Sequence, residues 1–238
     1  MILPAYIQIS ENLLERIAMG ELAPGERLPS ERELSKTLKV SRMTVRAALR
    51  VLDNKGLLMR RPGDGTYIAQ PKIKRQADKL VPFTQNMGKH GNQINSRLIL
   101  FERREAEASI ARKLEIPDSS PVYYFQRLRL LNQEIVLLEA CTMPLNRFLN
   151  LESFNLEKRS VYEVLESEYG VLPHYSHQSL EAVSATDYEA ELLEIESGAP
   201  LMLEQRVTFD DKDIPFEYGR DLYRGDRFCF MTEVAPLE

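Results

Sequence analysis

Two arginines, Arg127 and Arg129, stand two residues apart in a run of apolar residues that favours a β-strand. Residues i and i+2 of a strand point to the same face, so both guanidinium groups are expected side by side. Because arginine binds phosphate or carboxylate groups through paired hydrogen bonds, the spacing predicts a site for a small anion. Ser160 begins a predicted helix whose first N–H groups could complete that site, and Glu139 and Glu217 could accept from hydroxyl or amino groups. The alternative is that these side chains only form ion pairs with one another across strands.

A second group of candidate residues lies in 41–52, SRMTVRAALRVL. The apolar residues of this segment recur at helical spacing, which leaves Arg42, Thr44 and Arg46 on the other side of its first turns. Such side chains reach base edges when a recognition helix enters the major groove, where arginine binds guanine. Arg32, near the start of the preceding predicted helix, is placed to contact phosphate. A merely solvated helix surface is the alternative.

Other patterns predict no further chemistry. His174 and His177 lie three residues apart without a zinc-binding motif, so we expect surface or cavity-rim histidines and no metal site. The segment 63–65, Gly-Asp-Gly, lacks the spacing of a phosphate-binding loop and is expected at a hairpin tip, where Gly65 lets the backbone approach DNA. No catalytic motif is present, and no cofactor is expected.

The N-terminal elements would position the basic residues of 32–46. Periodicity over 7–17, a Ser30/Glu33 capping box before 31–38, and Ser41 before 42–52 predict three helices. Two short strands, 57–60 and 66–68, then flank a turn at 62–65. This order is typical of a winged helix-turn-helix, which we expect over 1–70. The basic segment 71–80, which begins with proline, is predicted to be a linker.

Residues 81–238 contain an internal repeat. A displacement of 79 residues aligns six pairs: Ala111/Ala190, Leu114/Leu193, Ile116/Ile195, Pro121/Pro200, Arg127/Arg206 and Ile135/Ile214. Each copy predicts a helix and two strands joined by a polar turn, over 122–131 and 135–143, and again over 201–209 and 214–223. Two such hairpins can pair into one antiparallel sheet with flanking helices. A further helix is expected at 160–169, capped by Ser160.

Charge is unevenly distributed along the chain. Residues 1–75 carry 14 Lys and Arg against 8 Asp and Glu, whereas the remainder carries 17 against 28. A basic N-terminal segment followed by an acidic remainder predicts that the N-terminal part contacts nucleic acid. No apolar run is long enough for a membrane helix, and the N-terminus lacks the features of a signal peptide, so no membrane partner is expected. Cys141 and Cys229, both expected to be buried thiols, favour the cytoplasm.

Residues 29–68, PSERELSKTLKVSRMTVRAALRVLDNKGLLMRRPGDGTYI, resemble the DNA-binding domain of GntR-type bacterial transcription regulators. The long motif PSERELS, followed by SRMTVRxAL, carries the resemblance. It implies that DNA is contacted by Arg32, Arg42, Thr44, Arg46 and Gly65.

Residues 80–235 are similar to the HutC branch of that family, whose effector domain has the UTRA or chorismate-lyase-like fold. The shared segments are FTQNM at 83–87, RLRL at 127–130, SVYEVLE at 160–166 and DLYRGDRF at 221–228. Within the branch, the chain resembles the N-acetylglucosamine-utilisation repressors, whose effectors are amino-sugar phosphates. The resemblance implies that the effector pocket is lined by Phe83, Thr84, Arg127, Leu128, Arg129, Glu139, Ser160, Val161, Tyr162, Glu217 and Tyr223.

These patterns together predict an α+β protein that acts as a metabolite-responsive repressor and not as an enzyme. We expect a homodimer on a palindromic double-stranded operator, with an anionic effector such as glucosamine 6-phosphate or N-acetylglucosamine 6-phosphate. Three alternatives stay open. The regulator could sense another small carboxylate or organic anion, the second domain could only dimerise, or the chain could be an enzyme on a lyase-like fold.

Overall fold

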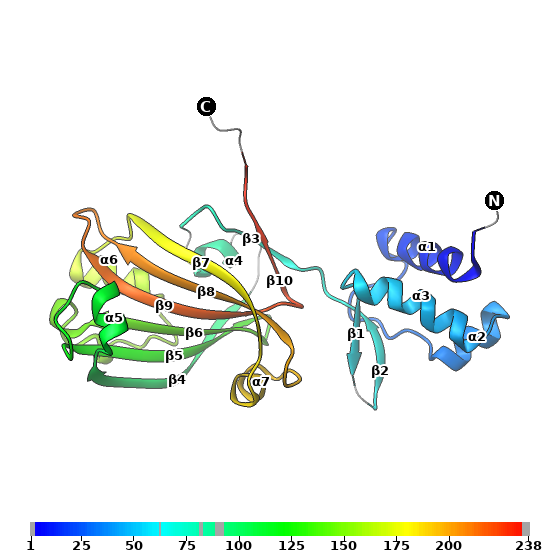
Figure 1. The fold of residues 1–238 in the computed structure, drawn as a ribbon, viewed down its shortest axis with the longest axis horizontal. Coiled ribbons are helices and arrows are strands. Elements are labelled where there is room, and N and C mark those ends of the chain that lie inside the picture. Colours follow the sequence, from blue (N-terminus) through cyan, green and yellow to red (C-terminus); the bar gives the residue numbers. More distant parts are fainter. Residues whose placement is uncertain (1–2, 62, 81–82, 89–92, 235–238) are drawn as a thin grey trace. The chain divides into compact units, whose positions relative to one another are not determined.

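The computed structural model describes residues 3–61, 63–80, 83–88 and 93–234. The chain divides into two compact units, Met1–Lys72 and Ile73–Glu238 (Figure 1). In the described part of the chain, no helix is both long enough and apolar enough to cross a membrane.

The first unit is a winged helix-turn-helix. It consists of α1 (Ala5–Ala18), α2 (Glu31–Leu38), α3 (Arg42–Asn54), β1 (Leu58–Arg61) and β2 (Gly65–Ile68). The predicted capping box starts α2: the Ser30 hydroxyl accepts from Glu33 N at 3.2 Å, and the Glu33 carboxylate accepts from Ser30 N at 2.8 Å. Ser41 likewise caps α3 by accepting from Thr44 N at 3.1 Å.

The core of this unit confirms the predicted helical periodicity. One cluster of buried residues joins the three helices to the hairpin and contains Leu13, Leu22, Leu28, Leu34, Val45, Leu49, Leu52, Leu58 and Ile68. Because these residues hold α3 by one side only, its other side is left to solvent.

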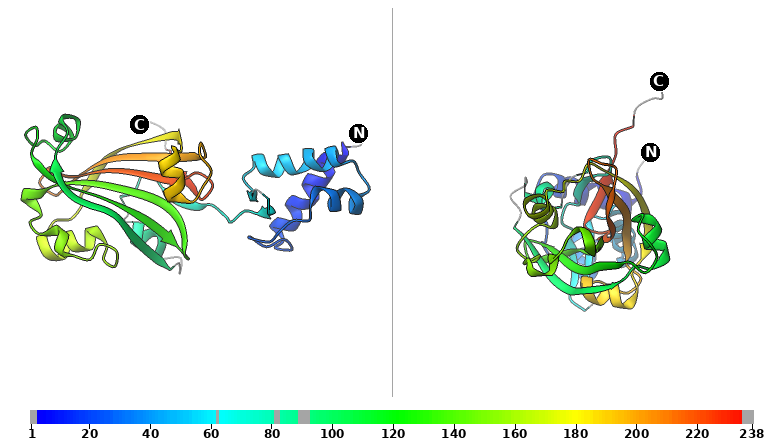
Figure 2. Two further views of the ribbon diagram at one scale, coloured as in Figure 1. Left: turned by 90° about the horizontal axis from the view of Figure 1, so that it is seen from below. Right: turned by 90° about the vertical axis from the view of Figure 1, so that its left-hand side faces the viewer.

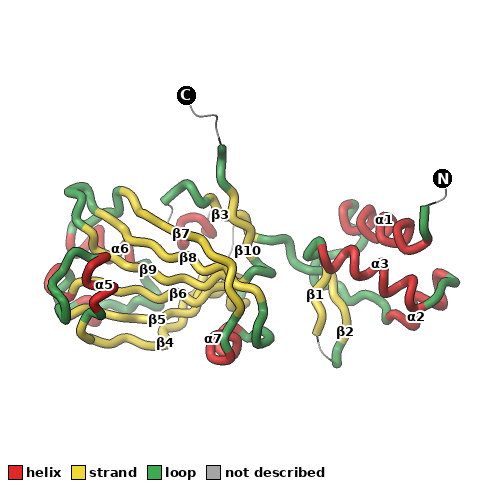
Figure 3. The backbone as a smooth tube through the Cα atoms, in the orientation of Figure 1, coloured by secondary structure: helices red, strands yellow, loops and turns green. Residues whose placement is uncertain are grey.

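The second unit is built on a six-stranded antiparallel sheet with the order β4-β5-β6-β9-β8-β7 (Figure 3). The strands are β4 (Ile94–Glu105), β5 (Pro121–Leu131), β6 (Glu134–Pro144), β7 (Tyr175–Ser184), β8 (Pro200–Phe209) and β9 (Pro215–Arg224). The connections between these strands contain α5 (Ala108–Lys113), α6 (Val161–Tyr169) and α7 (Asp187–Leu193), with short 3₁₀ turns at Leu145–Arg147 and Leu151–Ser153.

The sheet reproduces the repeat found in the sequence. The first half runs β4-α5-β5-β6 and the second runs β7-α7-β8-β9, and the two halves meet where β6 pairs with β9. The helix and hairpin of each copy are therefore as predicted, whereas the strands β4 and β7 were missed. Both are edge strands with many polar, half-exposed residues, which carry a weaker hydrophobic signal than the central strands.

The two faces of the sheet bury different cores. Tyr123 and Phe125 of β5 contact a cluster that includes Val164 and Leu165 of α6. Leu128 of the same strand belongs to a cluster on the opposite face with Leu193 of α7 (Figure 2). Because Arg127 and Arg129 follow Tyr123 and Phe125 at intervals of two residues, the charged residues share a face with the α6 cluster, and the α7 cluster lies on the other face.

The linker predicted over 71–80 is in part a strand of the second unit. β3 (Ile73–Gln76) pairs in parallel with β10 (Phe228–Met231), and α4 (Phe83–Gly88) follows it. Ile73 packs with Phe83 and Phe228, and Arg75 is 8% exposed, so alternate residues of this segment point inward. The proline and the lysines of this segment gave it the composition of a linker, so the alternation was not recognised in the sequence.

The prediction that both cysteines are buried was wrong for Cys229. Cys141 is buried between strands, but Cys229 is exposed, and both are free thiols. β10 turns Phe228 inward and therefore directs its neighbour Cys229 outward.

Candidate functional site

The exposed side of α3 carries two arginines that share one carboxylate. Arg46 donates to Glu31 of α2 through Nη2 at 2.8 Å and Nε at 3.2 Å, and Arg42 Nη2 lies 4.0 Å from the same carboxylate. The side chains of Arg42 and Arg46 are 63% and 45% exposed. Hydrogen bonding from Arg46 lowers the pKa of Glu31, so this carboxylate stays charged and orients both arginines.

The other predicted DNA contacts lie around this pair. Arg32 is exposed in the first turn of α2, and the Thr44 hydroxyl lies 2.8 Å from Ser41 Oγ in the first turn of α3. Gly65 has a φ of +150°, and a Cβ there would lie 2.8 Å from Arg27 Nε. Because Arg27 donates to the carbonyl oxygen of Asp64, it adds an exposed guanidinium to the wing that the sequence analysis missed.

The second unit contains a cavity of about 40 Å³ between the sheet, α4, α6 and the segment after β3. Ten of the eleven residues predicted to bind an effector line it, namely Phe83, Thr84, Arg127, Arg129, Glu139, Ser160, Val161, Tyr162, Glu217 and Tyr223. Leu128 does not line it, because the residue between two inward-facing arginines of a strand faces the opposite side.

The two arginines predicted from the sequence have different roles within this cavity. Arg127 is 1% exposed and fully engaged: Nε and Nη2 donate to Glu139 at 2.9 and 2.6 Å, and Nη1 donates to the carbonyl of Leu156 at 2.7 Å. Arg129 donates to Thr84 Oγ1 at 2.9 Å and only at 3.5 Å to Glu139. Its buried Nε has no partner among the described residues. The ion pairing considered as an alternative is thus present, and it leaves Arg129 with fewer and longer hydrogen bonds to described protein groups than Arg127.

A third arginine, Arg206, is the repeat counterpart of Arg127. It donates to Glu204 at 3.2 Å, to Glu217 at 3.0 Å and to Asp221. The guanidinium lies directly over Gly219, where a Cβ would be only 2.9 Å from Arg206 Cζ. Gly219 therefore makes room for the ion pairs, a role that no sequence pattern had indicated.

Three carboxylates stand in register on neighbouring strands, and the pKa values of two of them, Glu139 and Asp221, are shifted in opposite directions. Glu139 on β6 pairs with Asp221 on β9, which pairs with Glu204 on β8. Burial opposes ionisation of Glu139, but Arg127 and Arg129 lower its pKa to about 2. Burial, reinforced by the charges of Glu139 and Glu204, raises the pKa of Asp221 to about 7 despite Arg206. One acidic group of the cavity therefore changes charge near neutral pH.

The helix start at Ser160 is open to the cavity. Ser160 is the N-terminal residue before α6, but its hydroxyl makes no capping hydrogen bond, contrary to the prediction. Ser160, Thr84 and Tyr162 also line an adjoining groove of about 380 Å³. Tyr162 donates from its hydroxyl to Glu217, and burial raises the pKa of this phenol well above its ordinary value. The cavity thus has hydroxyl groups on one side and ion pairs on the other.

Seven lining residues were absent from the prediction: Arg75, Lys79, Leu80, Leu137, Gln178, Arg206 and Asp221. The repeat had already aligned Arg206 with Arg127, so a signal for it existed. Arg75 lay in the segment interpreted as a linker, and no pattern marked Asp221 as facing inward.

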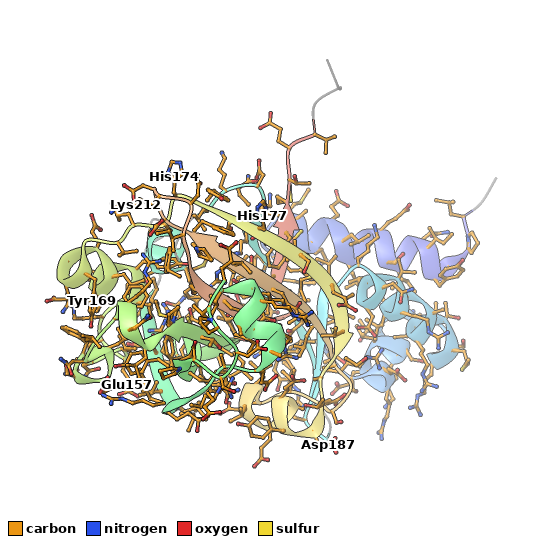
Figure 4. All side chains as sticks on the ribbon, turned by 60° about the vertical axis from the view of Figure 1, so that its left-hand side comes forward. Glu157, Tyr169, His174, His177, Asp187 and Lys212 are labelled. Carbon is orange, nitrogen blue, oxygen red and sulfur yellow. The ribbon has the colours of Figure 1, made fainter. Side chains whose placement is uncertain are left out.

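His174 and His177 are exposed at the start of β7 and are absent from the lining of the cavity (Figure 4). Their rings contact Tyr175 edge-on, with centroids 6.1 and 5.5 Å apart. Within the described residues no group of histidine, cysteine or acidic side chains could hold a metal ion.

Comparison with known proteins gives matches along the whole chain. The family model of "Bacterial regulatory proteins, gntR family" matches residues 5–68, and that of the "UTRA domain" matches residues 89–229. The "HTH-type transcriptional repressor NagR" of Bacillus subtilis is 35% identical, over 99% of this chain and 96% of its own. The "Mannosyl-D-glycerate transport/metabolism system repressor MngR" of Escherichia coli is 29% identical, over 95% of this chain and 94% of its own.

A solved structure agrees with these matches. The crystal structure of PhnF from Mycobacterium smegmatis superimposes with a TM-score of 0.68 at 28% identity. The superposition covers 95% of this chain and 99% of that one.

The titration of Asp221 predicts a pH-dependent stability. Its pKa is higher in the folded chain than in the unfolded chain, so its contribution to the free energy of unfolding is lost as pH rises through about 7. When the pH is raised from 5 to 8, the free energy of unfolding of Asp221→Asn should therefore increase by about 1–3 kcal/mol relative to that of the wild type. Urea unfolding at both pH values measures this difference, with the exposed Asp211→Asn as control. A difference between wild type and Asp221→Asn that does not change with pH would contradict the assignment.

The carboxylate that orients Arg42 and Arg46 predicts a change in DNA selectivity. Glu31→Gln removes a negative charge of α2 beside the exposed arginines of α3 and releases Arg46, so affinity for random DNA should rise while the preference for operator falls. Fluorescence anisotropy with operator and random duplexes measures both. Glu11→Gln, an equal charge change on α1, should leave the preference intact. If Glu31→Gln keeps the wild-type preference, Glu31 does not position the arginines.

Proposed function

Because the chain belongs to the GntR family of bacterial regulatory proteins and carries a UTRA domain, we propose that a small anionic metabolite controls its binding to operator DNA. The family assignment confirms the resemblance seen in the sequence, and it makes the chain a transcription regulator and not an enzyme.

The balance of charge around the cavity carries the proposal for the effector. Among the described residues, five basic side chains line it against three acidic ones, although the domain as a whole is acidic. Four of the five basic side chains are buried, and a buried guanidinium with a donor that has no partner in the described part of the chain, as in Arg129, favours an anionic ligand. Acidic and hydroxyl groups beside them suit the hydroxyl and amino groups of a sugar. A phosphorylated amino sugar such as glucosamine 6-phosphate or N-acetylglucosamine 6-phosphate combines these features, and the name of MngR links a similar protein to a sugar-derived carboxylate.

Binding of such a molecule needs a wider cavity. A volume of about 40 Å³ holds only one or a few waters, so the ligand must also use the groove of about 380 Å³ that shares Thr84, Ser160 and Tyr162. At this junction Arg129 donates to Thr84. A phosphate that replaces Thr84 as the acceptor of Arg129 would be bound by Arg129 and by the first N–H groups of α6.

The DNA complex is proposed to be a homodimer on a palindromic operator in the cytoplasm. Each chain has one recognition helix, α3, whose exposed end presents Arg42 and Arg46. One such helix reads few base pairs, so two chains on two half-sites give the specificity that a regulator requires.

Calorimetry tests the effector class. Glucosamine 6-phosphate or N-acetylglucosamine 6-phosphate should bind at least about 10-fold more tightly than the same sugar without phosphate. Arg129→Ala should remove this gain, because it deletes a cavity arginine whose only hydrogen bonds to described residues are to Thr84 and, at 3.5 Å, to Glu139. Arg97→Ala, which removes an exposed arginine of β4, is the matched control. Equal affinities for phosphorylated and neutral sugars would refute the anion site.

The roles of the DNA-facing arginines can be separated by comparing two variants. Arg46→Ala should lower operator affinity by roughly 10- to 100-fold and relax base choice, since it removes a base contact. Arg32→Ala should weaken operator and random DNA alike and reduce the salt dependence, since it removes a phosphate contact. Titrations at several salt concentrations measure both effects. If Arg46→Ala binds operator and random DNA as the wild type does, α3 is not the recognition helix.

A further inference from the structure

Arg75 of β3 is a buried cation with little internal compensation. Its Nη2 lies 3.6 Å from Glu204 Oε2, and its guanidinium carbon lies 5.3 Å from the centre of the Tyr223 ring. Nε and Nη1 are buried and have no hydrogen-bond partner among the residues that the structure describes. A buried guanidinium with unpaired donors is costly, so its persistence calls for an additional acceptor.

No nearby carboxylate of the described residues completes the hydrogen bonding of Arg75. Glu204 Oε2, the nearest acidic oxygen to Arg75, also accepts from Tyr223 Oη at 3.0 Å and from Arg206 Nη1 at 3.2 Å. Asp221 is bound by Arg206 through one oxygen, and its other oxygen, Oδ1, is buried without a hydrogen bond to Arg75 or to any other described group. The protein therefore does not complete the coordination of Arg75 with its own carboxylates.

Arg129 lines the same cavity and, like Arg75, has a hydrogen-bond donor to which no described group is a partner. Its Nε is buried without a partner in the described residues, and both Arg75 and Arg129 belong to the lining. They come from β3 and β5, which belong to different sheets of the second unit. Two guanidinium groups with free donors around one small cavity fit a multiply charged oxyanion better than a neutral ligand.

We propose that Arg75 binds the anionic group of the effector together with Arg129, and that it thereby ties occupancy of the cavity to β3. The inference rests on the proposed function and adds an effector-binding side chain from the segment that joins the two units. Ile73, the first residue of β3, directly follows Lys72, the last residue of the first unit. A shift of Arg75 toward a bound anion acts on β3, and so on the chain that leads to the DNA-binding unit.

Calorimetry on the full-length protein with glucosamine 6-phosphate, inorganic phosphate and glucosamine tests the proposal. Arg75→Ala should lower affinity for glucosamine 6-phosphate and for inorganic phosphate by roughly 10- to 100-fold, and affinity for glucosamine by less than about 3-fold. Lys74→Ala removes an equal charge from the exposed side of the same strand and should bind as the wild type does. A purely structural role of Arg75 would weaken all three ligands together, and that result would overturn the proposal.

Two further variants keep the test decisive if Arg75→Ala does not fold. Arg75→Lys keeps the charge and should bind glucosamine 6-phosphate more tightly than Arg75→Gln, whereas equal affinities would overturn the proposal.

Failure of this inference is distinguishable from failure of the proposed function. If Arg129→Ala loses phosphate selectivity and Arg75→Ala keeps it, only the role of Arg75 is refuted. If the wild-type protein shows no preference for phosphorylated ligands, both are refuted.

Discussion

The burial of arginine–carboxylate pairs on one face of the six-stranded sheet constrains much of the second unit. A charged group removed from water is stable only when opposite charges and hydrogen bonds replace its hydration. Arg127 meets this requirement through Glu139 and the Leu156 carbonyl, and Arg206 meets it through three carboxylates. Gly219 provides the space for the second arrangement. The apolar cores must therefore lie beside the charged cluster or on the other face, which is where α6 and α7 place them.

The duplicated sheet explains how so many charges reach one place. In each half the strand after the short helix carries an inward-facing arginine, Arg127 on β5 and Arg206 on β8. The halves meet at the β6–β9 pair, which brings Glu139 and Asp221 opposite one another. Their closeness favours the ionised form of only one of them, and the nearby arginines select Glu139. The same symmetry that builds the sheet thus builds a site with mixed charge.

Local patterns in the sequence predicted those features that depend on neighbouring residues. The capping residues Ser30 and Ser41, the helical periodicity of α3 and the same-face spacing of Arg127 and Arg129 depend only on short segments, and the structure contains all three. The family resemblance supplied most of the cavity lining that the spacing could not. Features set by tertiary contacts were missed, because the inward direction of Arg75 depends on the pairing of β3 with β10, a strand more than 150 residues away. The space over Gly219 and the exposure of Cys229 likewise depend on distant partners.

If the proposed function holds, an anion in this cavity and operator DNA on α3 influence the binding of one another. Thermodynamic linkage allows a direct measurement: operator affinity with and without saturating glucosamine 6-phosphate, and affinity for glucosamine 6-phosphate with and without operator. Coupling between the two sites requires that each ligand changes the affinity of the other by the same factor, which we expect within the range of about 5- to 150-fold that is usual for such coupling. An operator affinity unchanged by a ligand that calorimetry shows to be bound would contradict it.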